Sequence, residues 1–121
     1  MNNIELHNER IAKMIFASVY PLYLTKVEKK GRTKAELDQV VTWLTGFNNE
    51  KVQHFIDTRA TFSAFFQYAL LNPNASLISG TICDYRIEDI ADPLTKQVRY
   101  LDKLVDELAK GRTMDKILRG S

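Results

Sequence analysis

The strongest helix signals in the chain lie in residues 92–113, DPLTKQVRYLDKLVDELAKGRT. Asp92 offers a carboxylate to the free amides of the first turn, and Pro93 suits the first helical position because it has no amide hydrogen. Gly111 ends the helix, since glycine adopts a left-handed backbone without strain. Six apolar residues at helical spacing predict an amphipathic helix on which the rest of the chain packs: Leu94, Val98, Leu101, Leu104, Val105 and Leu108.

A second helix start lies upstream, in residues 33–36, TKAE. This is a capping box, in which the Thr33 and Glu36 side chains each accept a hydrogen bond from the other residue's backbone amide. We expect the helix that begins here to end at Gly46. Asn48 or Asn49 then caps another helix.

Thr61 caps one more helix, whose phenylalanines recur at helical spacing until Asn-Pro-Asn at residues 72–74 ends it. With the long helix, these segments predict a hydrophobic core. Ten residues are expected to be largely buried: Phe16, Val19, Leu37, Val41, Leu44, Phe62, Phe66, Val98, Leu101 and Leu108.

Residues 8–30 are predicted to be helical and apolar on nearly all sides, which indicates a central position. Because Pro21 cannot donate a backbone hydrogen bond, the segment is either kinked or made of two helices that meet near Tyr20. Its uncharged run, residues 14–25, would span about 18 Å as a helix, short of the roughly 30 Å core of a bilayer. We therefore expect a buried helix and no membrane segment.

The weakest signals lie in residues 75–91, where residues 77–83, LISGTIC, predict a short strand or extended segment. The fold class predicted overall is all-α: a compact bundle of about five to six helices in a single domain of residues 1–121. A last turn, capped by Thr113, follows the long helix. Gly120-Ser121 is interpreted as a vector remnant and given no structural weight.

The composition, 45% hydrophobic and 26% charged, is typical of a folded domain. The single cysteine excludes an intramolecular disulfide and a thiolate zinc cluster. The N-terminus, MNNIE, lacks the order of a signal peptide, so we expect a cytoplasmic protein. The sequence has no glycine-rich phosphate loop, zinc signature or nucleophile elbow, and predicts no cofactor and no metal.

Two segments, residues 13–47 and 77–119, resemble a family of small bacterial proteins catalogued as domain of unknown function 2200. The runs FASVYPLY, at residues 16–23, and RYLDKLVDELAKG, at residues 99–111, carry this resemblance. It implies a bacterial cytosolic protein with an orthogonally packed, all-helical bundle. It implies no activity and transfers no catalytic residues.

Three clusters of reactive residue types have ordinary structural interpretations. Cys83 would be a nucleophile beside His7 or His54, but an inert buried thiol is the commoner state of a lone cysteine. Four carboxylates could bind Mg²⁺ or Ca²⁺, but a solvated acidic turn is favoured: Asp84, Glu88, Asp89 and Asp92. Asp102 and Asp106 share a helix face with interleaved basic residues, which favours an exposed, charge-paired face over acid–base catalysis.

Residues 37–57 have the outline of a helix-turn-helix. The second helix would present Glu50 and Asp57 among its outward residues, and carboxylates are unfavourable beside DNA phosphates. Two helices joined by a glycine turn are also ordinary in small bundles. The pattern therefore disfavours a nucleic-acid partner.

The tetrapeptide Lys-Gly-Arg-Thr occurs twice, at residues 30–33 and 110–113, in basic stretches of local charge +4 (residues 26–34) and +3 (residues 110–119). Helix ends explain both copies: lysine in the last turn, glycine beyond it, threonine opening the next helix. If the two turns were adjacent in the fold, they would form an anion site, because guanidinium groups and free helix amides both favour phosphate. That site would consist of Lys30, Arg32, Lys110 and Arg112.

Three functions stay open from the sequence: a protein-interaction module, which we favour and which allows a protein partner or a second copy of the chain; an anion or nucleic-acid binder using basic turns 26–34 and 110–119; and an enzyme without a recognisable motif. The net charge of +2 selects none of them. The catalytic residues of such an enzyme are unknown, and the lack of a motif favours a non-enzyme. An exposed apolar groove would favour the first function, merged basic patches the second, and a deep polar cavity the third.

Overall fold

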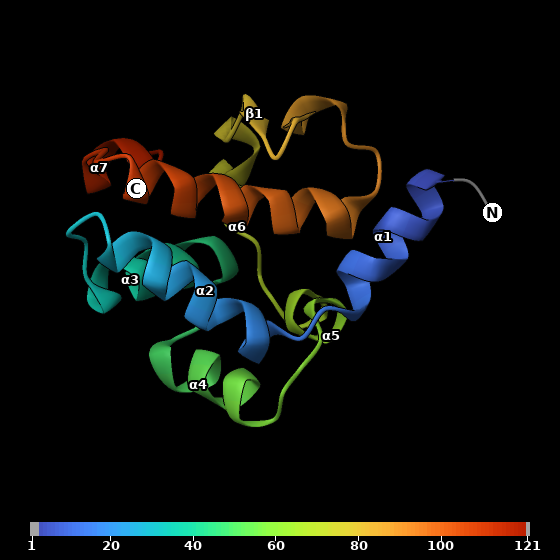
Figure 1. Cartoon of the computed structure of the whole chain (residues 1–121), viewed down its shortest axis with the longest axis horizontal. Helices are drawn as coiled ribbons and strands as arrows, with labels where there is room; N and C mark the ends of the chain where they lie inside the picture. Colours follow the sequence, from blue (N-terminus) through green and yellow to red (C-terminus); the bar gives the residue numbers. More distant parts are fainter. Residues whose placement is uncertain (1–2, 121) are drawn as a thin grey trace.

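The computed structural model describes residues 3–120 (Figure 1). Residues 1, 2 and 121 lie outside it, so the N-terminal MNNIE segment and the Gly120-Ser121 pair are described only in part. The described residues form seven α-helices: α1 (Asn3–Lys13), α2 (Phe16–Glu28), α3 (Lys34–Thr45), α4 (Asn49–Asp57), α5 (Phe62–Gln67), α6 (Pro93–Ala109) and α7 (Met114–Ile117). Between α5 and α6 lie two 3₁₀ helices and two short strands: η1 (Pro73–Leu77), β1 (Thr81–Ile82), β2 (Tyr85–Arg86) and η2 (Ile87–Asp89). The all-α class is confirmed.

The long helix predicted from residues 92–113 is α6, and it holds the centre of the bundle. The Asp92 carboxylate accepts from the Thr95 amide at 2.9 Å, as its cap position predicts. Helices α1, α2, α3, α5 and α7 all pack against α6, with α1 at one end of the molecule and α7 at the other (Figure 1). All ten residues predicted to be buried are buried.

The first predicted segment consists of two helices, but they meet at Met14 and Ile15 and not near Tyr20. The reason is tertiary. The Phe16 amide donates to the Ala60 carbonyl at 2.8 Å, and the Phe62 amide donates to the Met14 carbonyl at 2.8 Å. These two hydrogen bonds hold the chain extended between α1 and α2.

Helix α2 contains Pro21 on its exposed side, so the proline does not break the helix. The expectation of a helix buried on all sides is wrong, because Leu22 is 68% exposed. The buried face of α2 consists of Phe16, Val19, Tyr20, Tyr23 and Val27. The helix therefore covers the core from outside and does not run through its centre.

Helix α5 ends at Gln67, five residues before the predicted stop at residues 72–74. The chain beyond it runs past the end of α3, where the last carbonyls of a helix lack partners within the helix. The Leu70 amide donates to the Thr45 carbonyl at 2.8 Å, and the Asn72 amide to the Leu44 carbonyl at 3.0 Å. Pairing with α3 thus replaces the predicted final turn of α5.

Strands β1 and β2 form a hairpin in which Thr81 pairs with Arg86 and Ile82 with Tyr85. The expected extended segment at residues 77–83 is therefore confirmed at Thr81–Ile82. Cys83 (φ 52°) and Asp84 (φ 68°) form the two-residue turn, and two positive φ angles are typical of a type I′ turn. Expected burial of the Cys83 thiol is wrong, because this turn places it at an exposed tip.

None of the helices within residues 3–120 is long and apolar enough to cross a membrane.

Candidate functional site

Both Lys-Gly-Arg-Thr turns end a helix in the same way. Gly31 (φ 81°) and Gly111 (φ 88°) are left-handed. The Arg32 amide donates to the Val27 carbonyl at 3.0 Å, and the Arg112 amide donates to the Glu107 carbonyl at 3.1 Å. This is the Schellman motif, in which the residue after the glycine caps the final helical turn. The tetrapeptide forms a helix C-cap in both places.

The two turns lie side by side, although 80 residues separate them in the sequence. The Arg32 guanidinium donates through Nη1 to the carbonyl of Arg112 at 2.7 Å, and to that of Leu108 at 3.4 Å. It also forms an ion pair with Glu36 at 2.8 Å. Arg32 is therefore engaged with carbonyls at and just beyond the end of α6, where a cation is favourable.

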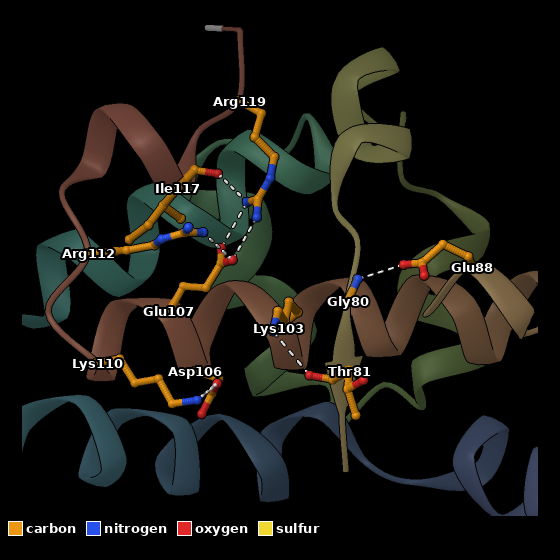
Figure 2. Close-up of polar contacts among 10 residues, drawn as sticks. All are labelled: Gly80, Thr81, Glu88, Lys103, Asp106, Glu107, Lys110, Arg112, Ile117 and Arg119. Carbon is orange, nitrogen blue, oxygen red and sulfur yellow. Dashed lines mark hydrogen bonds and ion pairs between the residues drawn. The ribbon is translucent and has the colours of Figure 1, made fainter. Parts of the chain in front are cut away.

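The Arg112 side chain binds Glu107 on α6 (Figure 2). Glu107 is only 5% exposed. Its carboxylate accepts from Arg112 Nη1 at 2.8 Å and from Arg119 Nη2 at 2.6 Å. The structure thus assigns to Glu107 a role that no sequence pattern predicted, because a charged residue at this position of a helix is ordinarily exposed.

The lysines of the two turns differ in their partners. Lys110 pairs with Asp106 at 3.0 Å, and Lys26 pairs with the same carboxylate at 3.3 Å (Figure 2 shows the Lys110 contact). Burial raises the pKa of Asp106, but the hydrogen bonds and charges of the two ammonium groups lower it further, and the net pKa lies below its usual value. Lys30 is exposed and has no ion pair within residues 3–120. Anion binding by Lys30, Arg32, Lys110 and Arg112 stays a prediction.

A cleft of about 530 Å³ opens at the other end of the molecule, between α1, the hairpin and the start of α6. Its volume falls within the range of about 300–1,000 Å³ that is typical of ligand sites. Apolar side chains line it together with polar groups: Ile4, Ile90 and Ala91 with His7, Tyr85 and Arg99. Ile4 lies at its edge and is 71% exposed.

Three planar side chains meet inside this cleft. The His7 and Tyr85 rings stack with their centroids 5.3 Å apart and an angle of 28° between the planes. The Arg99 guanidinium lies over the Tyr85 ring, 5.3 Å from its centroid. Arg99 Nη2 is also 3.3 Å from His7 Nε2. The group joins α1, the hairpin and α6 at one point.

The polar contacts continue from Arg99 into the bundle. Arg99 Nη1 pairs with Asp102 at 3.0 Å, and the Tyr23 hydroxyl donates to the same carboxylate at 2.5 Å. Burial, followed by the negative charge of Asp102, raises the pKa of Tyr23 well above its usual value. Tyr23 therefore stays protonated and holds the Asp102 carboxylate in place by its hydrogen bond. That carboxylate in turn orients the Arg99 guanidinium. A smaller pocket of about 310 Å³, lined by Phe62 of α5, also reaches His7, Arg99 and Asp102.

The acidic segment beside the cleft serves the local fold. Glu88 accepts from the Gly80 amide at 2.6 Å, which lowers the pKa of Glu88 (Figure 2). Arg86 pairs with Glu88 and Asp89, and Asp92 caps α6. Within residues 3–120, no three His, Cys, Asp or Glu side chains gather as metal ligands do. Asp84 has no hydrogen-bond or ion-pair partner in this part of the chain.

Sequence reasoning missed the group of His7, Tyr85 and Arg99 because its members are 78 and 14 residues apart. None of the three belongs to a motif, and each lies on a different element, α1, β2 and α6. The only available signal was that His7 and Ile11 share one face of a short amphipathic helix. Asp102 and Asp106 were correctly predicted to be charge-paired, but the expectation of an exposed face is wrong, because their side chains are only 17% and 15% exposed. The second partner of Asp102, Tyr23, was not predicted.

Comparison with known proteins supports the sequence resemblance. Residues 10–119 match the family described as "Uncharacterized protein conserved in bacteria", domain of unknown function 2200, and the chain therefore belongs to that family. The crystal structure of an uncharacterized protein, SP1917, is similar, with 42% sequence identity and a TM-score of 0.85 over 91% of each chain. No curated protein matches the sequence.

Proposed function

We propose that this member of the family is a protein-interaction module, and that the cleft between α1 and the hairpin receives a segment of a partner protein. The observation that carries the proposal is the cleft itself, with Ile4 exposed at its edge. Contact between an apolar wall and water is unfavourable, so a partner that covers the wall gains free energy of binding. Apolar walls with a few fixed polar groups are typical of binding sites.

The rim of the cleft favours a basic partner segment. Asp84 lies at the rim without an ion pair among the described residues. Asp89 is 4.0 Å from Arg86 Nε, a long and therefore weak ion pair. Arg99, by contrast, is already paired with Asp102. A segment with one apolar side chain for the wall formed by Ile4 and one lysine or arginine for Asp84 fits this arrangement.

A displayed library of short peptides tests this function. We expect selection on the wild-type protein to enrich an apolar residue close to a lysine or arginine. Ile4→Ser should weaken the selected peptides about tenfold, because the transfer of an isoleucine side chain from water is lost. Asp84→Asn should weaken them while keeping the turn, since asparagine tolerates a positive φ.

The matched control is Leu22→Ser, on the outer face of α2, where the side chain is 68% exposed and outside the cleft. This variant should bind the peptides as the wild type does. Enrichment of no sequence, or peptides that bind Ile4→Ser with unchanged affinity, would refute the proposed function.

A second candidate function is anion binding at the end of the molecule that carries both Lys-Gly-Arg-Thr turns. Its support is the adjacency of the turns, together with nine basic and six acidic residues in residues 26–38 and 106–119. Melting with and without millimolar phosphate at constant ionic strength tests it. Lys30→Gln is the suitable variant, because the Lys30 side chain has no ion pair in residues 3–120. A stabilisation by phosphate that persists in Lys30→Gln would contradict a site that includes this lysine.

A further inference from the structure

The two edges of the β1–β2 hairpin have different surroundings. Thr81 pairs with Arg86, and the Ile87 amide donates to the Gly80 carbonyl at 2.9 Å, which makes Thr81 and Arg86 a non-hydrogen-bonded pair. Their backbone groups therefore point outward, those of Thr81 to the free side of β1 and those of Arg86 to the free side of β2. Helix α6 covers the first edge, since Lys103 Nζ donates to the Thr81 carbonyl at 3.1 Å (Figure 2).

The outer edge of β2 lies at the cleft. Residues 84–86 line the cleft, whereas the two residues of β1 do not. Within residues 3–120 the sheet has two strands, so no third strand covers β2. As the N-cap of η2, Arg86 uses its carbonyl in the first hydrogen bond of that helix. Its N–H remains available, because no backbone carbonyl of residues 3–120 accepts from it.

This open edge is held in place by the rest of the fold. Ile82 on β1 and Ile87, directly after β2, are buried in the core. The Tyr85 ring stacks on the His7 ring and lies under the Arg99 guanidinium. A strand edge that is already positioned loses little conformational freedom when a second chain pairs with it.

We propose that the cleft binds its partner segment in an extended conformation, and that a backbone carbonyl of the segment accepts a hydrogen bond from the Arg86 amide. This inference rests on the proposed function and specifies how the segment is held. Addition of an extended chain to a free strand edge is a common mode of peptide recognition. A helical segment fits less well, because all its carbonyls except those of the last turn are already paired within the helix.

Side chains must supply the remaining contacts. A strand of two residues offers a single free amide, so the apolar wall and Asp84 are needed to hold the segment. Side chains on one face of an extended chain are two residues apart, whereas on a helix they are three or four apart. We therefore expect the selected peptides to carry their apolar and basic residues two positions apart. A spacing of three or four would indicate a helical segment and contradict the proposal.

Two variants of Arg86 isolate the contribution of its amide. Arg86→Pro removes the amide hydrogen, and the φ of −82° at this position is close to that of proline, which edge strands tolerate. Arg86→Ala is the matched control, because it loses the same ion pairs to Glu88 and Asp89 but keeps the amide. Titration calorimetry with the tightest selected peptide should show Arg86→Pro binding about fivefold to tenfold more weakly than Arg86→Ala, the effect of one hydrogen bond.

Amide hydrogen exchange of the wild-type chain, recorded by NMR, tests the same contact without a substitution. Saturation with that peptide should slow exchange of the Arg86 amide about tenfold or more, because the amide becomes hydrogen-bonded. The Ile87 amide is the internal control, since it already donates to the Gly80 carbonyl in the free chain and should change less. This measurement holds even where Arg86→Pro fails to fold.

The extended mode and the proposed function can fail separately. Unchanged exchange of the Arg86 amide at peptide saturation, or equal peptide affinity of the two folded variants, overturns the extended mode and leaves the proposed function standing. A library that enriches no sequence refutes both.

Discussion

The two Lys-Gly-Arg-Thr turns have the same four residues and the same backbone, yet their side chains form different contacts. In the first turn, Thr33 accepts from the Glu36 amide at 3.1 Å and Glu36 accepts from the Thr33 amide at 3.0 Å. In the second, Thr113 makes no such bond. The reciprocal half of the box differs because the position three residues after the threonine holds Glu36 in one case and Lys116 in the other, and a lysine has no acceptor. The threonine's own bond is lost for another reason, since the Lys116 amide donates to the Thr113 carbonyl at 3.0 Å instead of to its side chain.

The two arginines differ in how far away their partners lie in the chain. Arg32 reaches another helix and donates to the carbonyls of Leu108 and Arg112, while Arg112 pairs with the buried Glu107, five residues before it on α6, together with Arg119. A tetrapeptide thus determines where a helix ends, through glycine and the amide that follows it. What its cationic side chain binds depends on the surroundings: another helix in the case of Arg32, and a residue of the preceding helix in the case of Arg112.

The largest expected effect of a substitution near these turns belongs to Glu107→Gln. Loss of the carboxylate leaves Arg119, itself only 15% exposed at the side chain, without its charge partner, so the free energy of unfolding should fall by about 3 kcal/mol. Urea denaturation measures this change. Asp106→Asn on the same helix is the control, since its partners Lys26 and Lys110 are largely in water; a loss of the same size in both variants would show that burial of Glu107 is unimportant.

The two arginines should differ in the same assay. Arg32→Ala removes an ion pair and a charged hydrogen bond to a carbonyl, and should cost about 2 kcal/mol of unfolding free energy. Arg112→Ala should cost no more than about 1 kcal/mol, because the Arg112 side chain is 50% exposed and Arg119 continues to pair with Glu107. Equal losses would mean that the contacts across the two turns contribute nothing beyond local helix capping.

The smallest contrast concerns the threonines. Thr33→Ala should lower the free energy of unfolding by about 1 kcal/mol, because α3 loses its side-chain cap. Thr113→Ala should change it by almost nothing, since no cap hydrogen bond is present at α7. A stronger form of the test restores the box: Lys116→Glu should make Thr113→Ala costly, and additive effects of these two changes would contradict the capping-box explanation.

Much of the fold could be predicted because its signals are local. The starts of α3, α5 and α6 each depend on a cap side chain within three residues of the amide that it binds. Periodicity predicted most of the buried apolar face of α6, but not the burial of Thr95 and Glu107. Two boundaries could not be predicted, because distant backbone decided them: Ala60 and Phe62 separate α1 from α2, and the last carbonyls of α3 end α5 early.

The same distinction between local signals and tertiary contacts applies to the candidate sites. Sequence determined the helix class, the core residues and the ends of the helices, since these depend on side-chain polarity and backbone preferences within a few residues. Only the tertiary structure decided that the two basic turns touch, that Glu107 pairs two arginines, and that His7, Tyr85 and Arg99 meet in a cleft. Hydrogen bonds and ion pairs act over about 3 Å, so a contact between residues far apart in the chain exists only after packing has brought their helices together.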